Sequence, residues 1–486
     1  MEHIKYRVYS LLIVFFFATH VKGQSVFYKT FSGSTFDYAE GITQLPDSGY
    51  AITGGSGAFS VNSAQTFLML TDSLGNHLWT KSFGGNGSDW GKRVFYKPGI
   101  GFVIAGTTNS TSQGDYDFHL IFTDLNGDLV QQKKIGSINW EQLNDAVMLQ
   151  DGGFILIGET EGSTTQGKDI FLVRVDDVGD TLWTKTIASG EDDVAYAADT
   201  LNDSTIIIGG YSWSGFSSNS FLVSVNINGQ ENWRNFYGPP TSSRIYDLQI
   251  YDQRIYCGGE KTLAGESQCD YWIFRTDNVG NIEADYSVQN TGEDRITSIC
   301  VLDDSSFYAA LNTDSQNLNV FPNGSDAFIY KFHTGVYYNN FSRGFQGTNP
   351  DYINQLIETN DKGLAFAGTC GNERVYESLG TAVMIGKIGP NDELPPFQAD
   401  LGNDLVSIEI DNTLKQFAIY PNPSQGVFFI KGLNQNAEIS LFSMMGEFLY
   451  QFEDNSKIDL TTFPNGVYTL NILVDGKQSI HKIVKR

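Results

Sequence analysis

The chain has 486 residues, more than one small core needs, so we expect more than one domain. It carries 56 acidic and 31 basic side chains, a net charge of −25, and such a surface repels nucleic acids and anionic membranes. Its four cysteines are too few to form a disulfide scaffold in a chain of this length.

The first 23 residues have the pattern of a secretory signal peptide. Lys5 and Arg7 precede an apolar run at residues 11–18, and Gly23 supplies a small residue near the expected cleavage point. A membrane anchor is the alternative, but the run is shorter than the roughly 20 residues that span a bilayer. No later run of this kind follows, so we expect no transmembrane segment in the mature chain.

A turn that reads Asp-x-x-Gly, often followed by tryptophan four residues later, recurs along residues 72–335, with Asn226 in place of aspartate in one copy and a faded last copy at residues 333–335. Its glycines lie 50 to 55 residues apart, at Gly75, Gly127, Gly179, Gly229, Gly280 and Gly335. Each unit contains four strand-like runs, as at residues 145–149, 153–158, 169–176 and 181–187. A unit of four short strands cannot bury an apolar face alone and must stack on its copies.

The apolar second run of the unit occurs seven times, which predicts a seven-bladed β-propeller over residues 24–390. The last unit lacks a fourth strand, and a fourth-strand sequence at residues 26–31 precedes the first unit. We therefore expect residues 26–31 to complete the last blade and close the ring. These repeats resemble those of secreted bacterial β-propeller proteins, a resemblance that implies the fold and no common activity.

Residues 391–418 break the period at Pro395-Pro396, and we interpret them as a linker with one short strand. Residues 419–486 then alternate polar and apolar residues between Gly and Pro turns, which predicts a small β-sandwich of about seven strands.

This C-terminal module resembles the type A sorting domain of the type IX secretion system. The matching positions are Tyr420, Pro421, Asn422, Pro423, Gly426, Gly446, Gly466, Tyr468, Lys482 and Lys485. The resemblance implies a Bacteroidetes-type cell, type IX secretion machinery as a partner, delivery to the medium or the outer cell surface, and removal of the module. It also implies that Tyr420, Gly466 and Tyr468 shape a recognition surface without catalysing a reaction.

An acidic residue recurs 17 positions before the glycine of the second run. It is found at Asp37, Asp89, Glu141, Asp192 and Asp351, with Glu293 in a similar place. A ring of carboxylates could bind Ca²⁺, which prefers oxygen ligands. The alternative is that each carboxylate accepts backbone N–H bonds in its own loop, since a repeated residue is simply explained by a repeated turn. The segment Asp124–Asp128 resembles the start of a calcium loop but coincides with the recurring turn.

Several aromatic residues and cysteines have two interpretations each. Trp79, Trp183 and Trp233 fit packing of the outer strands, whereas Trp90, Trp140, Trp213 and Tyr211 fall in or near loops, where they could bind sugars or a protein partner. Cys257 and Cys269 could form a hairpin disulfide. Cys300 aligns with an apolar position and is expected to be buried.

No catalytic motif stands out, and G-x-S-x-G, P-loop and H-E-x-x-H patterns are absent. We therefore expect a binding or adhesion module for an extracellular glycan or protein. The alternatives are a hydrolase or lyase of extracellular polysaccharide, which would need a deep axial pocket with carboxylates of perturbed pKa, and a scaffold in a surface complex.

Overall fold

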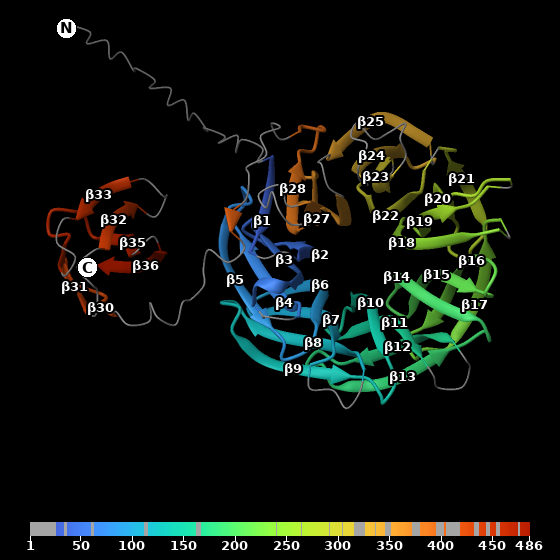
Figure 1. The fold of residues 1–486 in the computed structure, drawn as a ribbon, viewed down its shortest axis with the longest axis horizontal. Coiled ribbons are helices and arrows are strands. Elements are labelled where there is room, and N and C mark those ends of the chain that lie inside the picture. The colour runs from blue at the N-terminus through green and yellow to red at the C-terminus, as the bar shows by residue number, and fades with distance from the viewer. Residues whose placement is uncertain are drawn as a thin grey trace, which may run out of the picture.

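The computed structural model is almost entirely β-structure (Figure 1). It describes residues 26–33, 36–59, 63–110, 115–161, 167–239, 241–263, 265–290, 292–303, 305–314, 326–335, 337–345, 351–371, 380–394, 403–404, 418–431, 437–443, 448–452, 457–474 and 477–486. The signal-peptide segment lies outside these residues. No helix in the described part is long and apolar enough to cross a membrane.

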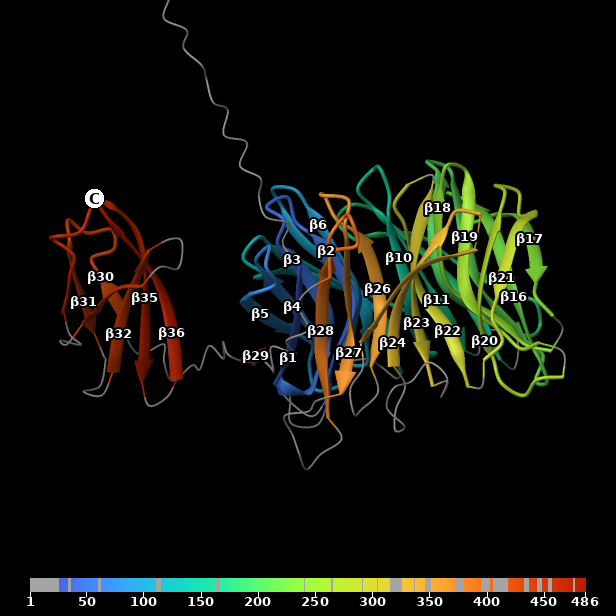
Figure 2. The ribbon, with the colours of Figure 1, turned by 90° about the horizontal axis from the view of Figure 1, so that it is seen from above.

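Seven antiparallel sheets stand around a central axis, and they are the seven blades of the expected propeller (Figures 1 and 2). Blades 1 to 3 are β2(Asp37–Gln44), β3(Tyr50–Ser56), β4(Gln65–Thr71) and β5(His77–Phe83); β6(Asp89–Lys97), β7(Gly101–Thr108), β8(Asp117–Asp124) and β9(Leu129–Ile135); and β10(Glu141–Met148), β11(Phe154–Glu161), β12(Lys168–Val175) and β13(Thr181–Ile187). Blades 4 and 5 are β14(Asp192–Asn202), β15(Thr205–Trp213), β16(Ser218–Asn226) and β17(Glu231–Tyr237); and β18(Ser243–Tyr251), β19(Arg254–Lys261), β20(Asp270–Thr276) and β21(Ile282–Ser287). Blade 6 is β22(Asp294–Val301), β23(Ser306–Thr313), β24(Asp326–His333) and β25(Tyr337–Phe345), and blade 7 contains β26(Tyr352–Glu358), β27(Leu364–Gly371) and β28(Thr381–Ile388). A short 3₁₀ turn, Gly57–Phe59, follows β3.

The chain closes its own ring, as the sequence predicts. Strand β1(Phe27–Ser32) pairs antiparallel with β28, from Phe27 opposite Lys387 to Phe31 opposite Val383, and so supplies the fourth strand of blade 7. Strand β29(Asn403–Asp404), within the expected linker, pairs parallel to the other edge of β1. Blade 7 is therefore built from the two ends of the propeller sequence, and β29 covers part of its outer edge.

Burial within a blade follows the position of each strand. Second strands such as β3 and β7 are buried along their whole length, because neighbouring blades pack on both of their faces. Fourth strands such as β9 and β13 are largely exposed and form the outer edge. This gradient explains why the second strand has an unbroken apolar sequence.

The recurring turn and tryptophan join one blade to the next. In the turn of blade 1, Asp72 Oδ1 accepts the N–H groups of Leu74 and Asn76, both at 2.8 Å, and Gly75 has a φ of 74°. The Trp79 ring of the same blade lies over Gly127 in the turn of blade 2, so closely that a Cβ on this glycine would be 2.4 Å from the ring. Trp183 meets Gly229 and Trp233 meets Gly280 in the same way. The tryptophans are therefore outer-strand packing residues, as expected.

The turn interpretation also fits Asp124, whose Oδ1 accepts the N–H groups of Asn126 at 2.9 Å and Asp128 at 2.8 Å. Cys257 and Cys269 are free thiols, so the structure contains no hairpin disulfide between them. Cys300 is buried in the apolar core, as its alignment predicted.

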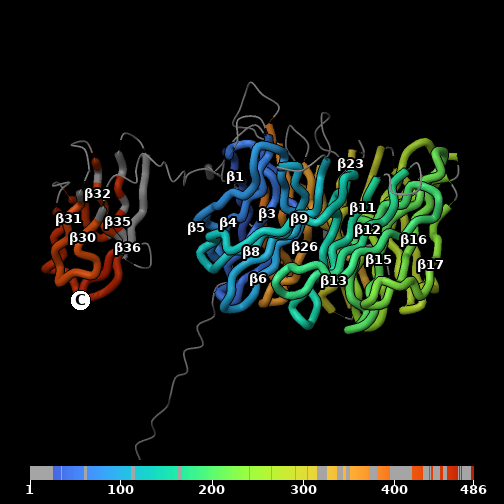
Figure 3. Tube along the Cα trace, turned by 90° about the horizontal axis from the view of Figure 1, so that it is seen from below, coloured from blue at the N-terminus to red at the C-terminus, as the bar shows by residue number. Residues whose placement is uncertain are grey.

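The C-terminal module has two sheets of its own (Figure 3). Strands β30(Ala418–Tyr420), β31(Val427–Lys431) and β34(Lys457–Asp459) form one sheet; β33(Phe448–Phe452), β32(Ala437–Ser443), β35(Gly466–Val474) and β36(Lys477–Lys485) form the other. A shared apolar cluster that includes Phe428, Ile439, Leu470 and Ile483 joins them. The expected small β-sandwich is thus present.

Candidate functional site

The innermost strand of every blade contains a β-bulge, which turns polar side chains towards the axis and towards the next blade. The residues at which the pairing register skips are Glu40, Lys92, Asn144, Tyr196, Tyr246, Thr297 and Asn354. The residue after the bulge lines the axial cavity in blades 2, 3, 5, 6 and 7, as Arg93, Asp145, Asp247, Ser298 and Gln355. One extra residue per blade therefore creates two rings of side chains that simple alternation along a strand would not predict.

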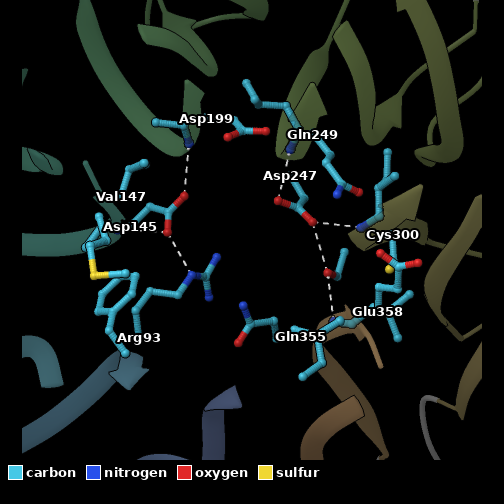
Figure 4. Close-up of a pocket in the computed structure, with 18 residues that line it drawn as sticks. Arg93, Asp145, Val147, Asp199, Asp247, Gln249, Cys300, Gln355 and Glu358 are labelled. Atoms are coloured by element: carbon cyan, nitrogen blue, oxygen red, sulfur yellow. Dashed lines mark hydrogen bonds and ion pairs between the residues drawn. The ribbon is translucent and has the colours of Figure 1, made fainter. Parts of the chain in front are cut away.

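An axial cavity of about 420 Å³ lies within the ring and is lined by innermost strands of blades 2 to 7. Figure 4 shows Asp145, Asp199 and Asp247 around it. Arg93 Nε donates to Asp145 Oδ1 at 2.7 Å. Burial opposes the positive charge of Arg93, but Asp145, Asp247 and Glu40 outweigh it and raise the pKa of the guanidinium.

The axial carboxylates connect neighbouring blades. Asp145 Oδ2 accepts the N–H of Ala198 at 2.9 Å, Asp199 Oδ2 accepts that of Ile250 at 2.8 Å, and Asp247 Oδ2 accepts that of Ile299 at 2.7 Å. Their Oδ1 atoms accept the N–H of the next residue in the same strand. Ser298 and Gln355 extend the pattern by accepting N–H groups of blades 7 and 1. We call these five side chains the axial belt.

Burial raises the pKa of Asp199 and of Asp247 to about 6 in each case, because little water reaches the ionised carboxylate. The hydrogen bonds from backbone N–H groups oppose this rise. Both oxygens of each carboxylate already accept hydrogen bonds from the fold, so the belt joins the blades before any ligand arrives.

The repeated acidic position lies at the start of the innermost strands and serves its own loop. Asp37, Asp89 and Glu141 accept the N–H of the residue four positions earlier at 2.7, 3.1 and 3.0 Å. Hydroxyl groups of the second strand also donate to them. Among the residues that the structure describes, no three His, Cys, Asp or Glu side chains come together as a group that could hold a metal.

Strand pairing corrects the register of this acidic position in two blades. Gly210, and not Gly209, lies opposite Ala195, so the equivalent of Asp37 is Asp193 rather than Asp192. Asp193 is fully buried and accepts the N–H of Ser189 at 2.7 Å, whereas Asp192 accepts that of Lys168 at 3.0 Å. In blade 6 the equivalent is Asp294, one residue after Glu293, and in blade 7 it is Asp351, which accepts the N–H of Gly371 at 3.1 Å.

Blades 4 and 5 differ from blades 3, 6 and 7 at the bulge position, while blades 1 and 2 carry Glu40 and Lys92 there, which form an ion pair at 2.7 Å. In blades 3, 6 and 7 a small side chain there donates to a carbonyl of the following blade: Asn144 to Ala195 at 2.9 Å, Thr297 to Ile353 at 2.6 Å, and Asn354 to Ala39 at 2.8 Å. Blades 4 and 5 carry Tyr196 and Tyr246 instead. These tyrosines replace a hydrogen bond between blades by a stack of rings.

A second departure lies beside the first, at the residue after the second-strand glycine. Thr107 and Asn312 in this position each accept an N–H from the next blade, at 3.0 and 3.1 Å. The equivalents in blades 3, 4 and 5 are Glu159, Tyr211 and Glu260. Three consecutive blades thus carry larger or charged groups where blades 2 and 6 use a small hydrogen-bonding side chain.

These departures meet on the entry face, which we define as the end of the ring at which the innermost strands begin. The ring of Tyr196 stacks on Tyr211 with centroids 5.8 Å apart and contacts Tyr246 at 5.1 Å. All three rings are half-buried. Arg244 lies over Tyr211, and the Tyr246 hydroxyl donates to Glu260 Oε1 at 2.9 Å.

Blade 3 continues this surface. Lys168 Nζ lies 4.6 Å from the centroid of the Trp140 ring and 3.2 Å from Glu159 Oε2. We call the whole set the tyrosine arc: Tyr196, Tyr211 and Tyr246 with Trp140, Glu159, Lys168, Arg244 and Glu260. Burial raises the pKa of both carboxyl groups, Glu159 and Glu260, while the neighbouring cations oppose the rise.

Two of the four loop aromatics named from the sequence, Trp140 and Tyr211, belong to the tyrosine arc. Trp90 packs on Tyr116, with centroids 5.2 Å apart, and Tyr116 in turn contacts Trp140. Trp213 is exposed two residues beyond Tyr211, and Phe216, at the tip of the same hairpin, is almost fully exposed. The other members of the arc were missed, although aligning the bulges would have shown tyrosine where other blades carry Asn or Thr.

Half of the residues expected to act in sorting lie at the end of β30 and in the connection from β30 to β31, and Lys482 and Lys485 lie towards the end of β36. Tyr420 is exposed beside Phe429, and Asn422 Oδ1 accepts the N–H of Val484 at 2.9 Å. Pro421 and Pro423 are exposed, and Gly426 has a φ of 126°. Lys485 is buried and donates to the carbonyl of Thr461 at 3.1 Å.

The remaining sorting positions lie elsewhere in the module. Gly466 lies near the ring of Tyr468, whose hydroxyl donates to the carbonyl of Pro464 at 2.7 Å. Lys482 pairs with Thr469 in the sheet. Gly446 lies outside the described residues.

Residues 418–486 match the family described as secretion system C-terminal sorting domain. The chain therefore carries a type IX sorting domain, and the protein is secreted or displayed at the cell surface. No curated protein matches the chain.

The solved structures that match are similar in fold alone. A mutant of puromycin hydrolase complexed with PGG is 11% identical, with 84% of this chain and 59% of that chain covered and a TM-score of 0.50. The β-propeller domain of the Trilobed protease from Pyrococcus furiosus is 9% identical, with 76% and 100% covered and a TM-score of 0.43. Sqt1 from Chaetomium thermophilum is 11% identical, with 84% and 97% covered and a TM-score of 0.42.

Proposed function

We propose that this secreted β-propeller, delivered by its type IX sorting domain, is a binding module that holds an extracellular carbohydrate on the tyrosine arc. Half-buried aromatic rings can pack against the C–H faces of sugar rings, and carboxylates and guanidinium groups beside them can hydrogen-bond the hydroxyls. The tyrosine arc provides both kinds of group on one face of three adjacent blades.

The observation that carries the proposal is the replacement of Asn and Thr by Tyr196 and Tyr246 at the bulge. Asn144, Thr297 and Asn354 each give the ring a hydrogen bond between blades, and the tyrosines give up that bond. The three rings contact one another within blade 4 and across to blade 5, yet they remain partly open to solvent, where a ligand can reach them. Binding of a ligand best explains why tyrosines occupy a position where blades 3, 6 and 7 form a hydrogen bond between blades.

Hydrolysis or elimination of a polysaccharide is the rival function. One observation at the axial cavity favours this rival: the pKa values of Asp199 and Asp247 are raised, as the pKa of a general acid would be. Their oxygens are engaged with N–H groups of neighbouring strands, so neither carboxyl group is free to reach a substrate without separating two blades. These hydrogen bonds support a structural role for Asp199 and Asp247, and for this reason we propose binding rather than catalysis.

The test is a screen of immobilised polysaccharides with the chain lacking residues 1–23, its variant Tyr246→Ala, and the control Tyr251→Ala. Tyr246 and Tyr251 lie near opposite ends of β18, so both variants remove a tyrosine from one strand but only the first alters the arc. We expect retention of the parent and the control, and loss of retention for Tyr246→Ala.

Three outcomes would overturn the proposal. Retention that survives Tyr246→Ala would place the site elsewhere, and release of new reducing ends from the same samples would make the protein an enzyme. Failure to bind any polysaccharide, combined with capture of a protein through the arc, would make it a protein-docking module. Melting curves for both variants show whether either effect arises from unfolding.

A further inference from the structure

The ion pairs of the propeller differ in which partner faces solvent: in Lys362–Glu358 the lysine is the more exposed, but many others present their carboxylate, in line with a net charge of −25. In Lys81–Asp128 and Lys133–Asp180, at the outer edge, the aspartate side chains are 67% and 64% exposed and the lysines are about half as exposed. In Lys387–Asp361 the lysine is buried and the carboxylate is exposed. A polyanion approaching these parts of the surface meets carboxylates first.

The two ion pairs of the tyrosine arc have the opposite orientation. Lys168 is 34% exposed over Glu159, which is 6% exposed, and Arg244 is 37% exposed over Glu260, which is 5% exposed. The cation therefore lies at the surface and the carboxylate lies beneath it. Arg295, near Glu260, is also exposed, but its partner Glu293 is more exposed than Arg295 itself, so this pair adds no cationic surface.

Aromatic rings hold both outward cations in place. Lys168 Nζ lies 4.6 Å from the Trp140 centroid, and the Arg244 guanidinium carbon lies 4.9 Å from the Tyr211 centroid. Each cation is thus fixed between a ring at its side and a buried carboxylate below, while about a third of each cationic side chain, 34% for Lys168 and 37% for Arg244, is open to solvent. Tyr196 stands between the two units, within electrostatic reach of both Glu159 and Arg244.

We propose that the ligand of the tyrosine arc is an acidic polysaccharide, whose sugar rings stack on the tyrosines while its anionic groups bind Lys168 and Arg244. This inference rests on the proposed carbohydrate-binding function and specifies its substrate class. Carboxylate and sulfate share the required chemistry, since both accept charge-assisted hydrogen bonds from a lysine and a guanidinium.

The experiment measures binding of the chain lacking residues 1–23 to four probes by affinity electrophoresis. Polygalacturonate and its carboxyl-reduced derivative share a backbone and differ in charge, while dextran sulfate and dextran provide the same contrast for sulfate. We expect binding to at least one charged probe, weakening by about tenfold or more on removal of its charge, because hydrogen bonds to charged groups are among the stronger ones. The preferred charged probe identifies carboxylate or sulfate as the recognised group.

Variants locate the effect. Arg244→Gln and Lys168→Gln should each weaken binding of the charged probe, and Arg244→Lys should retain part of the binding. Lys133→Gln is the control, because the exposed partner of Lys133 is the carboxylate of Asp180, and it should leave binding unchanged. Raising the salt concentration should weaken binding of the parent towards that of the variants. Melting temperatures show which variants are folded, and Arg244→Lys maintains the test if Arg244→Gln is not.

The outcomes separate the two proposals. Equal binding of the charged and uncharged probes, or an undiminished Arg244→Gln variant, would overturn the acidic class while carbohydrate binding stands. Failure to bind any of the four probes, together with failure across the wider polysaccharide screen, would overturn the proposed function itself.

Discussion

The outer edge of the ring and the tyrosine arc are built from the same repeat but follow opposite rules. At the edge, turn glycine and tryptophan recur with the same contact, Trp79 over Gly127 and Trp183 over Gly229. In the arc, blades 4 and 5 carry Tyr196 and Tyr246 at the bulge, and blades 3, 4 and 5 carry Glu159, Tyr211 and Glu260 in the second strand, where other blades use small hydrogen-bonding residues such as Asn144 and Thr107. In a repeat protein, the repeated residues therefore report on the fold, and the residues that break the repeat report on what the fold is used for.

The largest effect on stability should come from the closing strand, where no other copy can compensate. Phe31→Ala removes a fully buried ring from the cluster between blades 7 and 1, and we expect the free energy of unfolding to fall by about 3–5 kcal/mol. Phe216→Ala, a matched change of an almost fully exposed ring, should leave it unchanged. Chemical denaturation measures both, and equal losses would contradict the closure we describe.

The axial belt should make stability depend on pH. Because the pKa values of Asp199 and Asp247 are raised to about 6, the folded chain holds these protons more tightly than the unfolded chain, where aspartate has a pKa near 4. Their contribution is therefore full below about pH 4 and is lost as pH rises through about 6, by roughly 2–3 kcal/mol per carboxyl group. The difference in unfolding free energy between the parent and Asp247→Asn should fall over this range. A constant difference would refute the assignment.

The edge contact can be separated from backbone strain by a pair of glycine substitutions. Gly229 and Gly190 have φ angles of 73° and 92°, but a Cβ at Gly229 would lie 2.8 Å from the Trp183 ring and at Gly190 would meet nothing within 4 Å. Gly229→Ala should thus cost about 1–2 kcal/mol more than Gly190→Ala, since only the first adds a steric clash. Thermal melting of the two variants gives this difference directly.

The smallest effect on stability should belong to the tyrosine arc. Tyr246→Phe keeps the ring stack and removes only the hydroxyl that donates to Glu260, so we expect a loss of about 1 kcal/mol or less. Its effect on carbohydrate binding should exceed that of Gly229→Ala, which is the reverse of their order in stability. If Gly229→Ala had the larger effect on both stability and carbohydrate binding, the distinction between the outer edge and the tyrosine arc would be contradicted.

The seven blades and their closure could be predicted because each buried second strand leaves a continuous apolar run in the sequence. The position of the acidic residue in blade 4 could not be fixed, because Gly209 and Gly210 are adjacent and only strand pairing shows that Asp193 is the equivalent. The axial belt was missed because a bulge in each strand shifts the alternation by one residue. The orientation of Lys168 over Glu159 and of Arg244 over Glu260 depends on contacts between strands, which residue spacing in the sequence does not reveal.

The pairing of β1 with β28 also sets an order of events during export. Because a chain is synthesised from its N-terminus, Phe27 is present long before Lys387, its partner 360 residues later. Until β28 is present, β1 has unpaired edges that can pair with other chains. The sorting domain follows β28, so every polypeptide that displays a complete export signal already contains all the strands needed to seal its ring. A chain truncated before residue 418 would therefore lack the sorting domain, and one truncated before β28 would lack the partner of β1 as well.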